Sequence, residues 1–364
     1  MKKLFQAEMS YKKWCILTIA ITIGIILSAI LLVFIVDPHY RYRDPVLYKK
    51  AYIELYAIAP QILKREDYDL LMLGTSMTRN FFIEDIDSAF NCRSVKLAAA
   101  GGTIPDLCKF FEIAKKSKGN KLKRVVLSLD IYPFNKTEAH YKEFEYLYRD
   151  DYREEYKYFF SRQTYSTMLY LIKCHRRPKR ERKYATDRNR MFSTEYEGKP
   201  YGLKAVMKDA LHNEKIHHTQ TPYNPEAHNE NLKNLLSIID NNPQIEFIVY
   251  LPPYHIYTYC QSEFFGEADA LIKQRRVIMK ELLKRKNITL YDFQADRIYV
   301  VKHEYFSDVQ HFSNVAAKKI LNDIVTGGRK ITSPEQILLN EQELRTLIKE
   351  NMPEYKRHKS QFER

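Results

Sequence analysis

The stretch YDLLMLGTSMTRNFF, residues 68–82, joins two different local patterns. Its first half is a nearly continuous apolar run, which is typical of a strand buried on both faces of a sheet. The run stops at Gly74, and a different periodicity begins directly after it. A strand that ends here places a small hydroxyl side chain, that of Ser76, at its carboxyl end.

Short apolar runs of this kind recur along the chain, at residues 69–74, 94–101, 124–130, 246–253 and 288–293. Segments with helical spacing accompany them, at residues 46–64, 105–118, 226–241, 262–286 and 313–326. Apolar strands that alternate with helices predict an α/β fold with a doubly wound parallel sheet of five strands. We assign residues 66–326 to this domain.

One connection, residues 131–225, is too long for a simple loop. Its first part is rich in Tyr and has helical spacing, so we expect an inserted helical cap. Residues 174–190 follow, where eight of seventeen residues are Lys or Arg. This run is either a solvated basic face or a patch for anionic headgroups or polymer near a membrane. Residues 327–364 predict a helical tail, capped at Ser333 and frayed at its charged end.

The N-terminal region contains 23 residues without a charge, Trp14 to Val36. As a helix rising ~1.5 Å per residue, this segment crosses a hydrocarbon core of ~30 Å. A signal peptide would have a shorter apolar core and a small-residue cleavage site. We therefore predict a transmembrane helix at 14–36, between an N-terminal segment at 1–13 and a juxtamembrane linker and helix at 37–65. Lys12 and Lys13 directly precede the span, which favours a cytoplasmic N-terminus and an extracytoplasmic domain in the cell membrane.

The composition limits the partners of the chain. A net charge of +14 favours anionic neighbours such as lipid headgroups or an acidic envelope polymer. Nucleic acid is not expected, because a membrane-tethered chain without a recognition fold gives no reason to choose it. The five cysteines show no CxxC spacing, so we expect no metal site and no cofactor.

Ser76 opens the segment after the first strand, at the sheet edge where open α/β sheets place their ligands. A Gly-Thr-Ser turn alone predicts only a helix cap by Thr75 or Ser76. A second signal favours catalysis: Asp308 and His311 follow the last strand with a spacing of three. Asp308 could there fix the tautomer of His311, whose other ring nitrogen takes a proton from Ser76.

A third signal lies after the second strand, in AAAGGT at residues 98–103. Backbone N–H groups at Gly101 or Gly102, together with that of Ser76, could form an oxyanion hole at the same edge. An ordinary strand-to-helix turn is the alternative interpretation of the two glycines.

With these three blocks the sequence resembles the SGNH (GDSL-like) hydrolases and acyltransferases. The resemblance implies a flavodoxin-like sheet, a nucleophilic Ser76, an oxyanion hole with Gly101 or Gly102, and Asp308 with His311 as the remaining catalytic residues. Two departures stand out. The usual Gly-Asp-Ser is Gly-Thr-Ser here, and the family's Asn after the third strand is absent, where this chain has Asp130. Asp130 can donate a hydrogen bond only when it is protonated.

The anchored arrangement is most similar to the branch of this family that modifies cell-envelope polymers. That similarity implies transfer of an acyl group, with acetyl expected, onto an envelope glycan or teichoic-type polymer. It also implies a multispanning membrane-bound O-acyltransferase as partner. Two other hypotheses stay open: an esterase or deacetylase with the same triad, and a non-catalytic adaptor for the polymer or for the acyltransferase.

Overall fold

The computed structural model describes residues 10–176, 185–193, 198–215 and 223–363. The chain divides into two compact units. The first combines Met1–Ala51 with Glu145–Lys179, and the second combines Tyr52–Phe144 with Arg180–Arg364. The second unit contains the sheet.

The sheet has six strands within the described residues, in the order β2-β1-β3-β4-β5-β6. The strands are β1 (Leu70–Thr75), β2 (Ser94–Ala99), β3 (Arg124–Ser128), β4 (Glu246–Leu251), β5 (Ile288–Asp292) and β6 (Lys330–Ile331). The first five are the predicted strands, and they pair in parallel. The predicted number of five is wrong, because β6 adds an antiparallel edge strand. With two residues, β6 is too short to produce a readable alternation.

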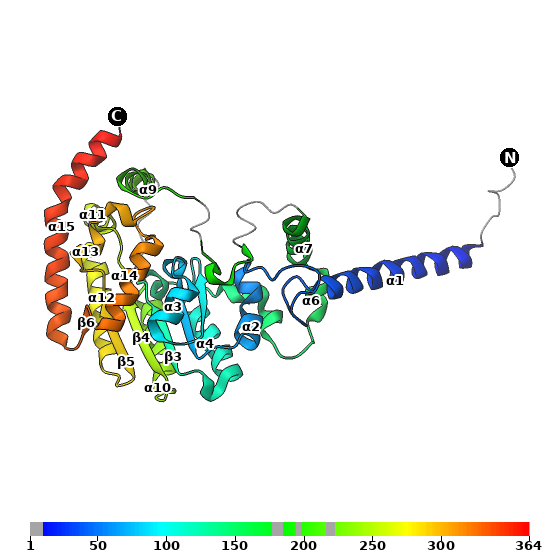
Figure 1. The fold of residues 1–364 in the computed structure, drawn as a ribbon. Helices are drawn as coiled ribbons and strands as arrows, with labels where there is room; N and C mark the ends of the chain where they lie inside the picture. Colours follow the sequence, from blue (N-terminus) through cyan, green and yellow to red (C-terminus); the bar gives the residue numbers. More distant parts are fainter. Residues whose placement is uncertain (1–9, 177–184, 194–197, 216–222, 364) are drawn as a thin grey trace. The chain divides into compact units, whose positions relative to one another are not determined.

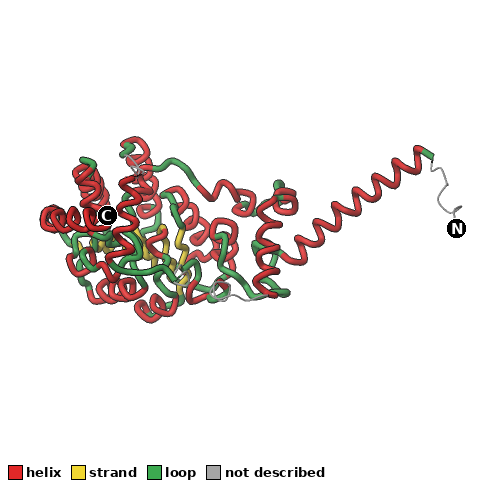
Figure 2. Tube along the Cα trace, turned by 90° about the horizontal axis from the view of Figure 1, so that it is seen from above, coloured by secondary structure: helices red, strands yellow, loops and turns green. Residues whose placement is uncertain are grey.

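Helices surround this sheet in the second unit, as Figures 1 and 2 show. The longer ones are α2 (Leu55–Arg65), α3 (Ile83–Phe90), α4 (Ile104–Lys118), α9 (Leu203–Lys215), α10 (Pro225–Asp240), α11 (Ile256–Phe264), α12 (Ala268–Leu283), α14 (Asn314–Thr326) and α15 (Pro334–Phe362). Shorter turns are η1 (Ser76–Thr78), η2 (Gly119–Lys121), η3 (Tyr132–Asn135), η4 (His140–Phe144), η5 (Arg188–Arg190), α13 (Arg297–Val300) and η7 (His303–Tyr305). The residues of β1 and β2 are all buried, which explains why β1 is largely apolar; β2 also buries Ser94 and Lys96.

Local chemistry explains most helix boundaries. α4 begins with a capping box, in which Thr103 accepts from the Asp106 N–H and the Asp106 side chain accepts from the Thr103 N–H. The single helix predicted at 262–286 is instead divided into α11 and α12, with Gly266 at φ +74° between them. The Ser333 cap of α15 is present, but the expected frayed end is wrong, because this helix continues to Phe362.

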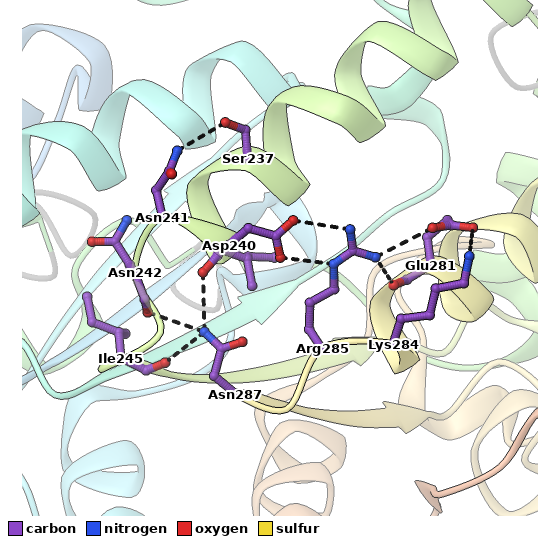
Figure 3. Close-up of polar contacts among 10 residues, drawn as sticks. Ser237, Asp240, Asn241, Asn242, Ile245, Glu281, Lys284, Arg285 and Asn287 are labelled. Atoms are coloured by element: carbon purple, nitrogen blue, oxygen red, sulfur yellow. Dashed lines mark hydrogen bonds and ion pairs between the residues drawn. The ribbon is translucent and has the colours of Figure 1, made fainter.

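Side chains at the amino-terminal edge of β4 and β5 fix the preceding turns (Figure 3). Arg285 donates two hydrogen bonds to Asp240, at 3.1 and 3.2 Å, which ties the turn after α12 to the end of α10. The Asn287 amide donates to three main-chain carbonyls, those of Ile239, Asn242 and Ile245. The polar side chains at this edge therefore fix turns of the fold.

The first unit contains α1 (Tyr11–Val36), which is long and apolar enough to cross a membrane. Most of its side chains are exposed, as a helix in contact with lipid requires. The unit also contains α5 (Glu145–Tyr148), α6 (Glu155–Phe160) and α7 (Arg162–Arg176), which come from the predicted insertion. Much of the basic run at 174–190 lies outside the described residues, so both interpretations of it stay open.

Candidate active site

Ser76 is placed by a sharp turn at the end of β1. It is the first residue of η1, and the preceding Thr75 side chain accepts a hydrogen bond from the Met77 N–H. Gly74 allows this turn, because a Cβ there would lie 2.4 Å from the Thr78 Cγ2 atom and 2.7 Å from the Cβ of Ser128. The sequence pattern therefore delivers a partly exposed serine at the carboxyl edge of the sheet.

The loop between η7 and α14 brings the other two predicted residues to Ser76. The Nε2 atom of His311 lies 2.7 Å from the Oγ of Ser76. The Nδ1 atom of the same ring lies 2.8 Å from Oδ2 of Asp308. The loop is closed by a bridge between Phe306 and Phe312, which holds the residues between them in a tight turn.

Hydrogen bonds fix the charge and tautomer of this group. Asp308 Oδ1 accepts the main-chain N–H groups of Gln310, at 2.8 Å, and His311, at 2.6 Å. Burial raises the pKa of Asp308, but these bonds and the contact with His311 outweigh it and hold the pKa below its ordinary value. An ionised carboxylate only accepts, so Nδ1 of His311 carries the proton and Nε2 accepts from the Ser76 hydroxyl.

The two predicted glycines differ in the state of their amides. The Gly102 N–H donates to the Ala99 carbonyl at 2.9 Å, which argues against its expected role in an oxyanion hole. Gly101 is exposed and lines the same cavity as Ser76. Among the described residues, neither the Ser76 N–H nor the Gly101 N–H has an acceptor, so these two donors are available for an oxyanion.

Asp130 is the site residue whose environment the sequence could not reveal. It follows β3, is buried, and lines the cavity beside Ser76. Its carboxylate accepts hydrogen bonds from the hydroxyl groups of Thr75 and Tyr254, the latter at 2.8 Å. Burial raises the pKa of Asp130 to about 6, against the opposing effects of Thr75, Tyr254 and His311.

Asn135 does not replace the family's missing asparagine in this structure. Its amide nitrogen donates to Gln274 at 2.8 Å, and its amide oxygen accepts from the Asn224 N–H at 3.3 Å. Both ends of the side chain therefore hold surrounding segments together. The residue that follows β3 and lines the cavity is Asp130.

The cavity above Ser76 has a volume of about 280 Å³. Asp130 and Lys136 are the charged residues in its lining. The other lining residues are polar or aromatic for the most part, and they include Tyr132, Asn213, Thr258, Gln261, Ser262, Phe265 and Gln310. The lining therefore offers hydrogen-bond donors and acceptors beside Ser76, which could orient a bound molecule.

A second group of potential ligands lies elsewhere in the same unit, formed by His303, Glu354 and His358. Its hydrogen bonds do not suit a metal. The Tyr257 N–H donates to Nδ1 of His255, so Nε2 of His255 donates to Nδ1 of His303 at 2.8 Å. The proton of neutral His303 is then on Nε2, and the ring has no free lone pair for a cation. We therefore assign no metal to this group, which instead connects α15 to the body of the unit.

Comparisons with known proteins add little to this site. No protein-family model matches the chain. No curated protein matches it. A solved structure from Streptococcus pneumoniae, described as “a putative platelet activating factor”, aligns at 10% identity and a TM-score of 0.40, and the match covers 76% of this chain and 92% of that chain. A similarity this low does not indicate the function of the chain, so the function is inferred from the geometry of the site.

Proposed function

We propose that the chain is a membrane-anchored serine acyltransferase of the SGNH type. The observation that carries the proposal is the hydrogen-bonded series Ser76, His311 and Asp308, with distances of 2.7 and 2.8 Å. Ser76 is 235 positions from His311 in the sequence, and the two meet at the carboxyl edge of the sheet. The order of the first five strands, 2-1-3-4-5, is that of flavodoxin-like sheets and supports the proposed fold type.

The first half of the reaction follows from the hydrogen bonds. Ser76 Oγ attacks the carbonyl carbon of the acyl donor while its proton moves to Nε2 of His311. Asp308, whose pKa is below its ordinary value, stays ionised and stabilises the imidazolium. The N–H groups of Ser76 and Gly101 donate to the oxyanion. The donor's leaving group takes the proton from His311, and the acyl group remains as an ester on Ser76.

The second half transfers this acyl group to a hydroxyl acceptor. The acceptor hydroxyl gives its proton to Nε2 of His311 as its oxygen attacks the ester carbonyl. The bond to Ser76 Oγ then breaks, and Ser76 takes the proton back from His311. We propose acetyl as the acyl group and an anionic envelope glycan or teichoic-type polymer as the acceptor. Lys136 at the cavity and the net charge of +14 support an anionic acceptor.

The membrane arrangement completes the proposal. α1 anchors the chain in the cell membrane, with the N-terminus in the cytoplasm. The SGNH-type domain, residues 66–326 with the insertion 131–225, is then extracytoplasmic. The uncharged length of α1 and the position of Lys12 and Lys13 support this orientation. A multispanning membrane-bound O-acyltransferase is the proposed source of the acyl group, on the strength of the family resemblance alone.

An acyl-enzyme experiment tests the proposal. The full-length chain in detergent is incubated with p-nitrophenyl acetate, and its intact mass is measured beside that of Ser76→Ala. We expect an acetyl adduct on the wild type only. An adduct that persists in water but transfers to added glycan indicates a transferase. Rapid hydrolysis indicates the esterase alternative, and absence of any adduct on the wild type contradicts the mechanism and favours the adaptor.

A further inference from the structure

The first unit holds the end of α1 in a network centred on Asp37, the residue that terminates this helix. Asp37 is buried, and its carboxylate accepts from three consecutive main-chain N–H groups, those of residues 41–43, at 2.8–2.9 Å. It also accepts from the hydroxyl group of Tyr158, in α6, at 2.6 Å. The carboxylate therefore fixes α6 directly against the last turn of α1.

Aromatic rings continue this connection. The ring of Phe34, in the last turn of α1, lies 5.1 Å from that of Tyr42. Tyr42 in turn stacks on Phe159 of α6, with centroids 6.2 Å apart and planes inclined by 17°. The Tyr42 ring therefore lies between Phe34 of α1 and Phe159 of α6 and contacts both.

A buried ion pair and a second helix complete the unit. Arg41 lies 3.2 Å from Glu155 of α6, with side-chain exposures of 5% and 13%. α7 is connected through Thr167, whose hydroxyl group lies 3.3 Å from Nε2 of the buried His39. Breaking such buried contacts is costly, so α6 and α7 stay with the end of α1.

The depth of this unit in a membrane follows from the length of α1. At ~1.5 Å per residue, the 23 uncharged residues from Trp14 to Val36 extend about 34 Å, slightly more than the ~30 Å of the hydrocarbon core. The end of α1 therefore lies where hydrocarbon meets the headgroups. Since α6 and α7 pack on that end, they lie at the same level.

The outer surface of α6 and α7 is apolar at this level. The exposed fractions are 59% for Tyr156, 48% for Phe160 and 54% for Leu169, and Ile172 is also exposed. Lys157, Arg162 and Lys173 lie beside them in sequence. Aromatic and aliphatic side chains accompanied by cations are typical of segments that lie in the interface of a bilayer.

We propose that α6 and α7 form a second membrane attachment, in which Tyr156, Phe160 and Leu169 enter the interfacial layer of the bilayer that α1 spans. The occupant of this surface is lipid, because α6 and α7 contact the end of α1, whose last turn also exposes the apolar Phe34 and Ile35. Helices of the insertion that the sequence predicts as a cap thus contact the membrane. This inference depends on α1 being a span, and it is independent of the acyl-transfer chemistry.

Tryptophan fluorescence tests the proposal, because Trp14 is the chain's one tryptophan. The full-length chain is placed in nanodiscs whose lipids carry a spin label near the headgroup. In a Trp14→Phe background, Phe160→Trp and Leu169→Trp provide single reporters, and Leu339→Trp on α15, at an exposed position of the second unit, provides the control. We expect quenching at 160 and 169 to exceed that at 339 severalfold.

Each other outcome overturns the proposal in a distinguishable way. If lipids labelled near the headgroup quench Trp14 in the wild type but leave 160 and 169 unquenched, the start of α1 lies in the bilayer and the attachment does not exist. If Trp14 itself is not quenched by any lipid, the span and the attachment both fail. If 160 and 169 are shielded from lipid and from an aqueous quencher alike, a protein surface covers them. An acetyl adduct on Ser76 in any of these cases leaves the proposed chemistry intact.

Discussion

His311 Nε2 and Ser76 Oγ lie 2.7 Å apart, although 235 positions separate the two residues in the chain. The two belong to different connections of one parallel sheet, and each connection leaves the sheet at its carboxyl edge. Their distance is that of a direct hydrogen bond, so a proton can move between them without rearrangement of the backbone. The chain's own side chains therefore already form the hydrogen-bonded series Ser76, His311 and Asp308.

When residues act together in one reaction, the losses of activity caused by replacing each of them do not add. We expect Ser76→Ala, His311→Ala and the double variant each to lower acylation by a similar factor, at least about 10⁴. The measurement is the rate of p-nitrophenyl acetate turnover, with thermal melting to confirm that each variant is folded. A double variant whose loss equals the product of the two single losses would show that the residues act independently.

The proposed role of Asp308 is to hold the tautomer of His311. Asp308→Asn keeps the shape of the side chain but presents an amide N–H, and we expect kcat to fall about 10⁴-fold. Asp209→Asn is the control. Asp209 supports the same loop through the Val309 N–H at 3.2 Å but makes no hydrogen bond to the imidazole. The control is expected to change kcat by no more than a few-fold, and equal losses in both variants would reduce Asp308 to a loop anchor.

Asp130 makes stability depend on pH. Its pKa is about 6 in the folded chain and 3.8 in its unperturbed state, so the folded state binds more protons between these values. Stability therefore falls as pH rises through this window, by roughly 3 kcal/mol, and levels off above it. Asp130→Asn removes the titration. We expect its melting temperature, measured in detergent from pH 4 to 7.5, to vary less with pH than that of the wild type. Identical pH profiles would mean that Asp130 titrates normally.

Gly74 is required by the close approach of β1 to its neighbours. A Cβ there would lie 2.7 Å from the Cβ of Ser128, in the adjacent strand β3, so Gly74→Ala must displace either strand. Overpacking of this kind costs about 1–3 kcal/mol, and it also moves Ser76, two residues away. We expect a lower melting temperature and reduced activity together. Gly328→Ala, where the nearest atoms are 3.3 Å or more away, is the control and is expected to change neither property strongly.

Several features could be predicted because they depend on neighbours in the chain. The continuous apolar runs identified all five parallel strands, since strands covered on both faces have no polar side. The uncharged segment at 14–36 lies within α1, and it could be predicted because a long helix without a polar face is visible in the local sequence. Ser76, Asp308 and His311 were selected by their positions after strands, and parallel strands bring those positions to one edge.

Other features depend on contacts that no local pattern records. β6 is held by pairing with β5 rather than by a pattern of its own. The Gly102 amide is occupied by the Ala99 carbonyl, which only the path of the turn decides. The raised pKa of Asp130 arises from burial, which the hydrogen bonds from the Thr75 and Tyr254 hydroxyl groups only partly offset.

The sequence alone therefore predicted the α/β class, a segment long and apolar enough to span a membrane, and the three residues Ser76, Asp308 and His311 that lie together in the structure, because local composition reveals buried strands and their ends. Only the tertiary structure decided which amides remain free, how Asp130 titrates, and that residues 145–176 form one unit with the end of α1. Those properties depend on hydrogen bonds and burial between residues far apart in the chain, such as Asp37 and Tyr158, and such pairs appear only when the chain is folded.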